Sequence, residues 1–182
     1  MNLRTVRLRL EPLEARHAAE MFAGLQDPSI FAYIPDQPPQ TISELANRYA
    51  GLATGWSPDR KERWFNWALR LTDESRYIGH VQATLHEDRS ASIAYVLFCD
   101  ARGKGYGIEA VETMMQHLFS QHRVSLFRAS VDIRNAPSVA LLESLGFSRV
   151  SLGREGDPDE AEYSRAAADA PGSALLLARE QG

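Results

Sequence analysis

The sequence predicts a mixed α/β (α+β) fold, in which a central, mixed but mostly antiparallel sheet of about six to seven strands is flanked by helices. Two observations predict it. Stretches of alternating apolar and polar residues take turns along the chain with stretches whose apolar residues recur at helical spacing. Three neighbouring strand-like stretches are also joined by short polar links, and a strand–helix–strand unit follows them.

The first third of the chain contributes one strand and two helices. Apolar residues alternate with arginine over residues 6–10, which predicts a strand, and residues 13–25 show helical spacing. Thr41, followed three residues later by Glu44, is a capping box. It predicts a second helix that runs to about residue 54.

Three strands are expected in the middle of the chain. Alternation of apolar and polar residues predicts strands over residues 65–71, 77–86 and 91–98. Residues 87–90 are polar and read as a hairpin turn. Because the links are short, these strands should form an antiparallel meander.

A strand–helix–strand unit follows the meander. Residues 105–121 carry an apolar stripe at helical spacing, and residues 127–133 alternate as the next strand. Such a unit implies a right-handed crossover and locally parallel pairing. Residues 135–145 predict a short helix, for which Gly146 suits the C′ position.

The C-terminal part has a weaker pattern. Residues 157–172 are acidic and then alanine-rich, with two prolines, and we interpret them as an irregular loop. Residues 173–179 predict a final strand. At 182 residues, the whole chain, 1–182, is expected to form a single domain.

Composition excludes several classes of partner. Hydrophobic content of 44% and charged content of 24% are ordinary for a globular protein, and a net charge of −4 argues against nucleic-acid binding. The single cysteine, Cys99, cannot form an internal disulfide, which favours a reducing compartment. No run approaches the roughly 20 apolar residues of a membrane span. We therefore expect a cytoplasmic protein with neither a nucleic acid nor a membrane as partner.

The most informative motif is a glycine-rich basic turn between a strand and a helix. Gly103, Gly105 and Gly107 remove the Cβ atoms along the turn, so backbone N–H groups can approach a ligand closely. Arg102 and Lys104 add positive charge, and the following helix N-terminus adds its dipole. The alternative is an ordinary tight turn, but the combination favours an anion site, and in particular a site for a pyrophosphate.

Spacing separates this turn from two common phosphate motifs. A P-loop requires Gly, four residues and then Gly-Lys-Ser/Thr, whereas here Lys104 is followed by Gly105, and position 98 is Phe. A dinucleotide-binding fingerprint requires G-x-G-x-x-G, whereas this turn has G-x-G-x-G. The sequence thus disfavours a nucleotide-dependent phosphoryl enzyme.

What remains, Arg102-x-x-Gly105-x-Gly107, resembles the acetyl-CoA loop of the GCN5-related N-acetyltransferase (GNAT) superfamily. Residues 132–147, from an Asn at a strand end to a closing Gly-Phe, resemble the second motif of that superfamily. Asn-x-x-Ser at 135–138 and Gly-Tyr-Gly-x-Glu-Ala at 105–110 resemble the RimJ/RimL-type branch, which acetylates N-termini of ribosomal proteins. The resemblance extends from about residue 7 to residue 150. Beyond it the chain is longer and departs from the pattern.

The resemblance implies the GNAT fold, acetyl-CoA as cosubstrate and no metal. The residues that it implies for cofactor binding are Leu97, Phe98, Arg102, Gly103, Lys104, Gly105, Tyr106, Gly107 and Asn135. It also implies a catalytic role for Ser138 as the acid that protonates the leaving thiolate, because the tyrosine used elsewhere in the superfamily is absent from 141–143. Independently of the resemblance, Asn135 could be a simple helix N-cap, and Ser138 could satisfy N–H groups of the first turn.

The activity implied is N-acetylation of a primary amine by direct attack on acetyl-CoA in a ternary complex. The acceptor could be a peptide or protein α-amine, an amino acid or a small amine, and a homodimer stays open as an assembly. The absence of an obvious base leans toward α-amines, whose pKa of about 7.7–8.0 lies well below that of lysine. The alternative is a catalytically degenerate GNAT domain that binds acyl-CoA or a partner without turnover.

Overall fold

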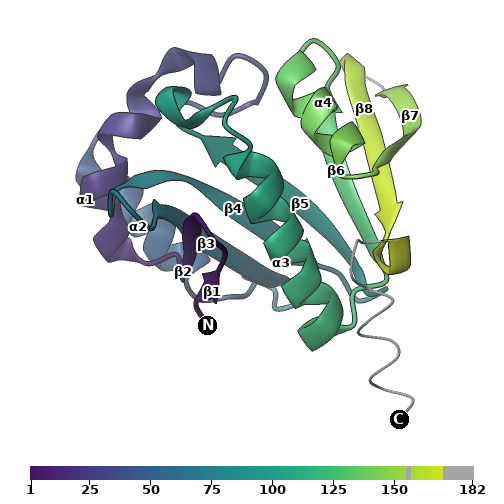
Figure 1. The fold of residues 1–182 in the computed structure, drawn as a ribbon, viewed down its shortest axis with the longest axis horizontal. Helices are drawn as coiled ribbons and strands as arrows, with labels where there is room; N and C mark the ends of the chain where they lie inside the picture. Colours follow the sequence, from purple (N-terminus) through teal and green to yellow (C-terminus); the bar gives the residue numbers. More distant parts are fainter. Residues whose placement is uncertain (155–156, 170–182) are drawn as a thin grey trace.

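The computed structural model describes residues 1–154 and 157–169 of the chain. Their strands form one eight-stranded sheet in the order β1-β2-β3-β4-β5-β6-β8-β7 (Figure 1). The strands are β1 (Leu3–Arg4), β2 (Leu8–Pro12), β3 (Arg63–Leu71), β4 (Tyr77–Leu85), β5 (Ser90–Leu97), β6 (Leu126–Asp132), β7 (Ser148–Arg154) and β8 (Asp157–Ala166). Every neighbouring pair is antiparallel except β5 with β6. The mixed, mostly antiparallel sheet and the parallel crossover are therefore confirmed.

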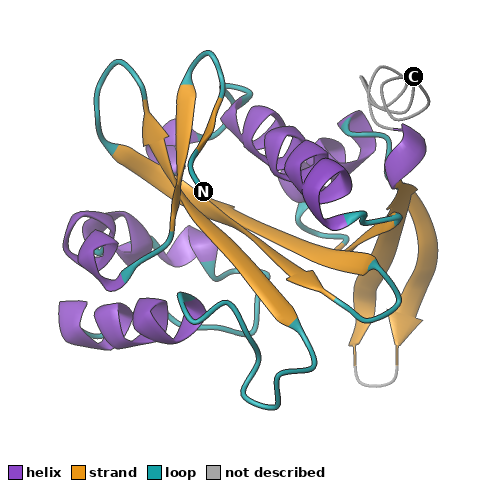
Figure 2. Cartoon of the chain, turned by 90° about the horizontal axis from the view of Figure 1, so that it is seen from below, coloured by secondary structure: helices purple, strands orange, loops and turns teal. Residues whose placement is uncertain are grey.

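Helices cover both faces of the sheet (Figure 2). The long helix α3 (Tyr106–His122) lies on one face, and α1 (Ala18–Met21) and α2 (Ile42–Leu52) lie on the other. The helix α4 (Ala136–Ser144) follows β6 directly. Thr41 caps α2 by accepting a hydrogen bond from the Glu44 N–H at 3.0 Å, as the capping box predicted.

Residues 13–25 form short pieces instead of one continuous helix. They comprise the 3₁₀ turn η1 (Ala15–His17), α1 and the 3₁₀ turn η2 (Ala23–Gln26). A third 3₁₀ turn, η3 (Pro28–Ile30), follows. In the described residues, no helix is long and apolar enough to cross a membrane.

Alternation along the strands divides the core into two layers. In β3, Trp67 and Leu69 face the cluster beneath α3, whereas Ala68 between them joins the cluster beneath α1 and α2. The same alternation in β5 sends Tyr95 and Leu97 to the α3 side and Phe98, just after the strand, to the α1 and α2 side. Residues two apart in β5 therefore share one face of the sheet.

The sheet opens between β5 and β6. Their parallel pairing covers only three residue pairs, from Ser90 with Leu126 to Ser92 with Arg128. Both strands continue beyond these pairs and separate, so that the half carrying β6, β8 and β7 splays away from the half carrying β1–β5 (Figure 1). The glycine-rich turn follows β5, and α4 follows β6, so both motifs lie at the opening.

Two expectations for the strands were wrong. Residues 157–166, expected to be part of an irregular loop, form β8, which lies inside the sheet between β6 and β7. The first strand pattern began at Val6, but β2 begins at Leu8 and the Val6 side chain is 93% exposed. The final strand expected at 173–179 lies outside the described residues.

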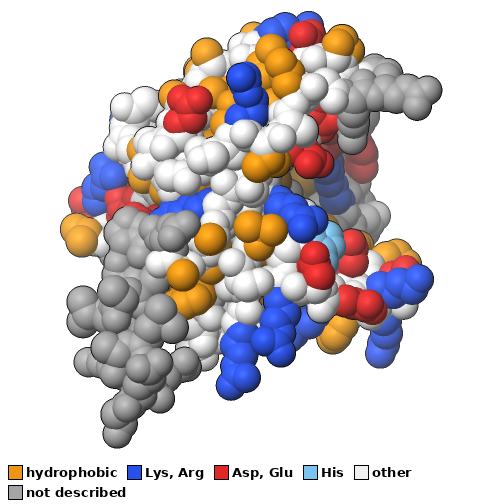
Figure 3. All heavy atoms as spheres, turned by 90° about the vertical axis from the view of Figure 1, so that its right-hand side faces the viewer, with side chains coloured by type: hydrophobic (Ala, Val, Ile, Leu, Met, Phe, Trp, Pro, Cys, Tyr) orange, Lys and Arg blue, Asp and Glu red, His pale blue; other side chains and the backbone are white. Residues whose placement is uncertain are grey.

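The outer strand of the splayed half is β7. Val150 and Leu152 of β7 are exposed. On the side of the molecule that carries β7 and β8, hydrophobic side chains are interspersed with charged ones of both signs (Figure 3).

Candidate functional site

The glycine-rich turn is a backbone structure that two of its three glycines make possible. After the 3₁₀ turn η4 (Cys99–Ala101), Gly103 and Gly105 have φ angles of +72° and +79°. This left-handed region costs other residues free energy because their Cβ atoms crowd the backbone. An added Cβ at Gly103 would contact nothing within 4 Å, so the φ angle alone favours glycine there.

The first turn of α3 faces this loop and has no side-chain cap. Gly105 is the N-cap residue and has no side chain that could accept a hydrogen bond from the first turn of α3. The first N–H groups of a helix have no partner within the helix, and they carry the positive end of its dipole. This helix end is therefore suited to bind an anion such as a pyrophosphate.

Gly107 has a different role from the other two glycines. It is buried in the first turn of α3, and an added Cβ would lie 2.6 Å from Leu141 Cδ1 and 3.2 Å from Leu97 Cδ1. Gly107 thus lets α3 approach both α4 and the end of β5. The first turn of α3 and the middle of α4 approach closely because Gly107 has no side chain at this point.

The two basic residues of the turn behave differently. Arg102 donates from Nε to the Leu97 carbonyl at 3.1 Å and from Nη1 to Ser29 Oγ at 3.0 Å, which ties the turn to β5 and η3. Lys104 has an exposed side chain. The predicted phosphate contact is therefore open to Lys104, whereas Arg102 holds the turn in place.

A third arginine, Arg7, anchors the start of α3. Its guanidinium donates to Glu109 Oε2 at 2.6 Å and to the Lys104 carbonyl at 2.9 Å, and it lies over the Tyr106 ring at 4.6 Å. Burial disfavours the charged form of Glu109, but hydrogen bonds from Thr5 and Arg7 outweigh it and lower the pKa of this carboxyl. Alternation in the sequence indicated only a solvent-facing Arg7 and gave no sign of this role.

The end of β5 offers one backbone N–H to the opening. Phe98 donates its N–H to the Ile78 carbonyl of β4 at 2.9 Å, and its ring is buried against Gly24. Successive N–H groups of a strand point to opposite sides, so the N–H of Leu97 points away from β4 and toward the opening. The Leu97 carbonyl, which accepts from Arg102, also points away from β4. Of these two residues expected to bind the cofactor, Leu97 thus turns its N–H toward the opening, and the Phe98 N–H is engaged within the sheet.

The structure brings the second motif to the same opening. Asn135 is the N-cap of α4, and its Oδ1 and carbonyl accept from the Ser138 N–H at 3.3 and 2.9 Å. Ser138 therefore lies in the first turn of α4, with its hydroxyl 2.8 Å from the hydroxyl of Tyr95. Nothing in the alternating pattern of residues 91–98 marks Tyr95 as a side chain that crosses to another element.

Two hollows lie near these residues. One, of about 180 Å³, lies on the α2 side of β3, β4 and β5, at the point where β5 leaves β6. Its lining carries no ionisable side chain and consists of Leu52, Trp64, Asn66, Gln82, Ala83, Thr84, Ser92, Ile93 and Ala94. Asn66 Oδ1 accepts from Gln82 Nε2 at 2.8 Å, which fixes the orientation of both amides.

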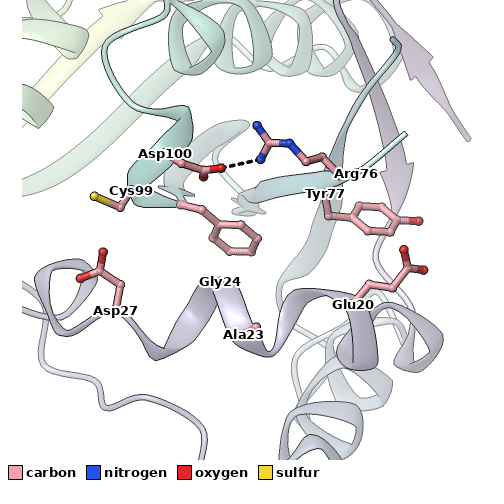
Figure 4. Close-up of a pocket in the computed structure, with 9 residues that line it drawn as sticks. Glu20, Ala23, Gly24, Asp27, Arg76, Tyr77, Cys99 and Asp100 are labelled. Atoms are coloured by element: carbon pink, nitrogen blue, oxygen red, sulfur yellow. Dashed lines mark hydrogen bonds and ion pairs between the residues drawn. The ribbon is translucent and has the colours of Figure 1, made fainter. Parts of the chain in front are cut away.

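The other hollow, of about 450 Å³, lies between η2 and the start of β4, against η4 (Figure 4). It is lined by the carboxylates of Glu20, Asp27 and Asp100, and its one lining cation, Arg76, is paired with Asp100 at 2.7 Å. This charge disfavours a phosphate. The α3 N-terminus is therefore better suited to an anion than this hollow is.

The part of the chain described here holds no group of three or more His, Cys, Asp and Glu side chains that could bind a metal ion.

Known proteins resemble this chain in sequence and in fold. Residues 7–148 match the family model of the acetyltransferase (GNAT) domain. An uncharacterized N-acetyltransferase of Bacillus licheniformis, p20, is 28% identical over 153 residues, which cover 84% of this chain and 85% of that protein.

Solved structures share the fold at lower identity. RimL, an α-N-protein acetyltransferase of ribosomal L7/L12 solved with coenzyme A, has a TM-score of 0.78 and 14% identity, and the match covers 91% of this chain and 98% of RimL. The ribosomal-protein-S5-alanine acetyltransferase of Vibrio fischeri has a TM-score of 0.76 and 17% identity over 94% of this chain and 99% of its own. Spermidine N-acetyltransferase of Vibrio cholerae, solved with CoA and spermine, has a TM-score of 0.73 and 19% identity over 90% and 98%.

Proposed function

The chain belongs to the GNAT family of acetyltransferases, and we propose that it moves the acetyl group of acetyl-CoA to a primary amine by direct attack in a ternary complex. The observation that carries the proposal is the convergence on one opening of the uncapped α3 N-terminus, the Leu97 N–H and the Ser138 hydroxyl. These groups supply an anion site, an oxyanion donor and an acid.

The binding role falls to the backbone of the turn and to few side chains. The N–H groups of residues 103–107 would hold the pyrophosphate, with Lys104 as the exposed cation, and Asn135 would contact the cosubstrate from the α4 side. Tyr106, under Arg7, and Gly107, against Leu97, keep the first turn of α3 in place.

The chemical role falls to Leu97 and Ser138. The Leu97 N–H would donate to the oxygen of the thioester carbonyl as negative charge develops there. Ser138 would give its proton to the sulfur as the carbon–sulfur bond breaks, which is a typical task of a general acid. The acetyl group would lie between them.

The acceptor is proposed to enter from the opposite face of the sheet. The 180 Å³ hollow lies beside β5 on the α2 side, whereas Ser138 and Tyr95 lie on the α3 side. Access from both faces supports direct transfer, because donor and acceptor could be bound together. A lining without ionisable side chains favours an amine that is partly neutral near pH 7.5, as an α-amine with a pKa of about 7.7–8.0 would be.

A calorimetric titration with acetyl-CoA tests the binding site, with Gly103→Asn and Gly103→Asp as a matched pair. Asn and Asp tolerate a left-handed φ and have nearly the same shape, so the pair differs in one negative charge. We expect Gly103→Asp to bind at least about tenfold more weakly than Gly103→Asn, because its carboxylate repels the pyrophosphate. Equal affinity of the two variants would mean that the pyrophosphate does not bind at the turn. Absence of binding by the unmodified protein would overturn the proposal.

Turnover separates an enzyme from a domain that only binds. Release of free CoA is followed with a thiol reagent while α-amines of peptides, amino acids and small amines are supplied in turn. Binding of acetyl-CoA without release of thiol above the rate of hydrolysis, with every acceptor, would favour the degenerate domain.

A further inference from the structure

Tyr95 contacts Ser138 but has no part in the reaction proposed above. It lies on β5 beyond the last residue that pairs with β6, and its hydroxyl reaches α4, 2.8 Å from Ser138 Oγ and 3.2 Å from the Ser138 carbonyl. The ring thus spans the opening between the two halves of the sheet. Its only polar atom meets the one residue that the proposed reaction requires as an acid.

Counting protons limits what these two hydroxyls can do. Each carries one proton, and the carbonyl of Ser138 only accepts. If the tyrosine donates to the carbonyl, the serine proton bonds to the tyrosine oxygen and is not available to a ligand. If the tyrosine donates to Ser138 Oγ, the serine proton is free to point into the opening. Negative charge in the opening favours the second arrangement.

We propose that Tyr95 is a positioning residue for Ser138, whose hydroxyl donates to Ser138 Oγ and directs the serine proton at the departing sulfur. This inference rests on the proposed acetyl transfer. A hydrogen bond accepted by the serine oxygen also polarises its O–H, because hydrogen bonds in a chain strengthen one another. The phenol thus reaches the first turn of α4 from β5, while 141–143, further along the same helix, lack a tyrosine.

The proposed transfer balances in protons with the serine as the acid. The amine nitrogen bonds to the carbonyl carbon, the carbon–sulfur bond breaks, and the sulfur takes the proton of Ser138. The serine oxygen keeps the hydrogen bond from Tyr95 while it is short of a proton, and water returns that proton. The amide nitrogen loses its extra proton to water, so the sum is one acetyl transfer with no net change in the protein.

Tyr95 itself is suited to donate a hydrogen bond and not to give up its proton. Burial raises the pKa of its phenol to about 12, and the hydrogen bond with Ser138 opposes this only in part. The phenol therefore stays protonated at neutral pH and remains available as a hydrogen-bond donor.

The test measures the ionisation of the thiol of CoA bound to the protein, which requires no acceptor and no turnover. Thiolate absorbance in the ultraviolet is followed against pH, and the titration of the same variant without CoA is subtracted to remove Cys99 and the tyrosines. The variants are Tyr95→Phe, which removes one oxygen atom, Ser138→Ala, Ser138→Thr and the double variant Tyr95→Phe with Ser138→Ala. Tyr49→Phe is the matched control, because its buried hydroxyl donates a hydrogen bond to Met21 Sδ, at 3.8 Å, and not to Ser138.

We expect Tyr95→Phe to bind CoA within about threefold of the unmodified protein, and to lower the ionisation constant of the bound thiol by about three- to tenfold. Ser138→Ala should lower this ionisation constant further, and adding Tyr95→Phe to Ser138→Ala should not change it again. Ser138→Thr should have nearly the ionisation constant of the unmodified protein. With an acceptor present, kcat should fall about tenfold in Tyr95→Phe while the KM for acetyl-CoA changes little.

The outcomes distinguish the two proposals. If CoA binds and its thiol ionises identically in the unmodified protein and Tyr95→Phe, the positioning role is wrong and acetyl-CoA binding stands. An equal effect of Tyr95→Phe with and without the serine hydroxyl would also overturn it, because the phenol would then act independently of Ser138. If the unmodified protein fails to bind CoA, both proposals fall. Melting curves of Tyr95→Phe and Tyr49→Phe reveal any general loss of stability.

Discussion

At the scale of single residues, glycine carries two different meanings within five positions. The sequence predicted one role for Gly103, Gly105 and Gly107, namely to let the backbone approach a ligand. The structure separates them, because the first two have a left-handed φ and the third is a contact point between α3 and α4. The spacing G-x-G-x-G contains both the glycines required by the left-handed backbone and the glycine required by a close contact. The second requirement is visible only from the packing partner Leu141.

Gly107→Ala is expected to destabilise the protein by about 1–3 kcal/mol, because a Cβ would lie 2.6 Å from Leu141 Cδ1 and α3 would have to move. The control is Gly51→Ala in α2, where an added Cβ meets nothing within 4 Å. It should stabilise by up to about 1 kcal/mol through helix propensity. Urea unfolding measures both.

A double-mutant cycle identifies the contact. Leu141→Ala removes the atom that a new Cβ would meet, so Gly107→Ala should cost clearly less in the Leu141→Ala background. Stabilisation by Gly107→Ala alone, like that expected at Gly51, would mean that Leu141 yields without cost.

At the scale of elements, β8 is the segment whose local sequence misled. Its acidic residues, its alanines and Pro158 are poor strand formers, so the pattern predicted a loop. Its alternation is nevertheless present, with Ala161, Tyr163 and Arg165 buried. A small alanine and a charged arginine gave that buried face no apolar signal, and pairing with β6 and β7 on both sides decides the structure.

The same substitution at two alanines of β8 tests whether the segment is a buried strand. Ala161 is fully buried and pairs with Val131 and Leu152, whereas Ala166 is exposed. Ala161→Glu should destabilise by several kcal/mol, because a carboxylate would be buried without a partner. Ala166→Glu should change the free energy of unfolding by no more than about 0.5 kcal/mol. If neither substitution changes the free energy of unfolding in denaturant titrations, these residues do not form a buried strand.

At the scale of the whole molecule, the sequence predicted the halves of the fold better than the gap between them. Alternation and helical spacing located β3, β4, β5, α3 and β6, because each has a strong period of its own, and the residues at its two ends, Asn135 and Gly146, located α4. The opening between β5 and β6 has no period. It exists because pairing ends at Ser92, and beyond that residue the first turn of α3 packs against α4 at Gly107. Motifs could therefore name Ser138, but its partner Tyr95 became visible only when the two halves were placed together.

The response of stability to pH is also a property of the whole fold, and three histidines from two elements set it. His80 of β4 has a buried Nδ1 with no hydrogen-bond partner in residues 1–154 and 157–169. Burial, and then the charge of Arg48, lower the pKa of His80 to about 4, and Asp36 opposes this only partly. Burial also lowers the pKa values of His117 and His122 in α3.

A lowered histidine pKa means that the unfolded chain binds more protons than the folded one between the two pKa values. Stability is therefore full above pH 6.5, the ordinary histidine value, and falls as the pH drops toward 4. By linkage, His80 alone accounts for at most about 3 kcal/mol of this loss. Carboxylates with lowered pKa values, such as Glu11 and Asp132, lose their contribution only below 4.5 and 3.8, their ordinary values.

Between pH 6.5 and 4.5, His80→Gln should reduce the slope of the unfolding free energy against pH, because glutamine does not titrate there. The reduction should be at most the slope that about one bound proton produces. The measurement is a series of urea titrations at fixed ionic strength, with His86→Gln as control, since the ring of His86 bonds to Ser92 and lies beside Glu62 near the sheet surface. If His80→Gln retains the full slope, the proton uptake belongs to the α3 histidines, and the buried ring of β4 stays neutral without consequence for folding.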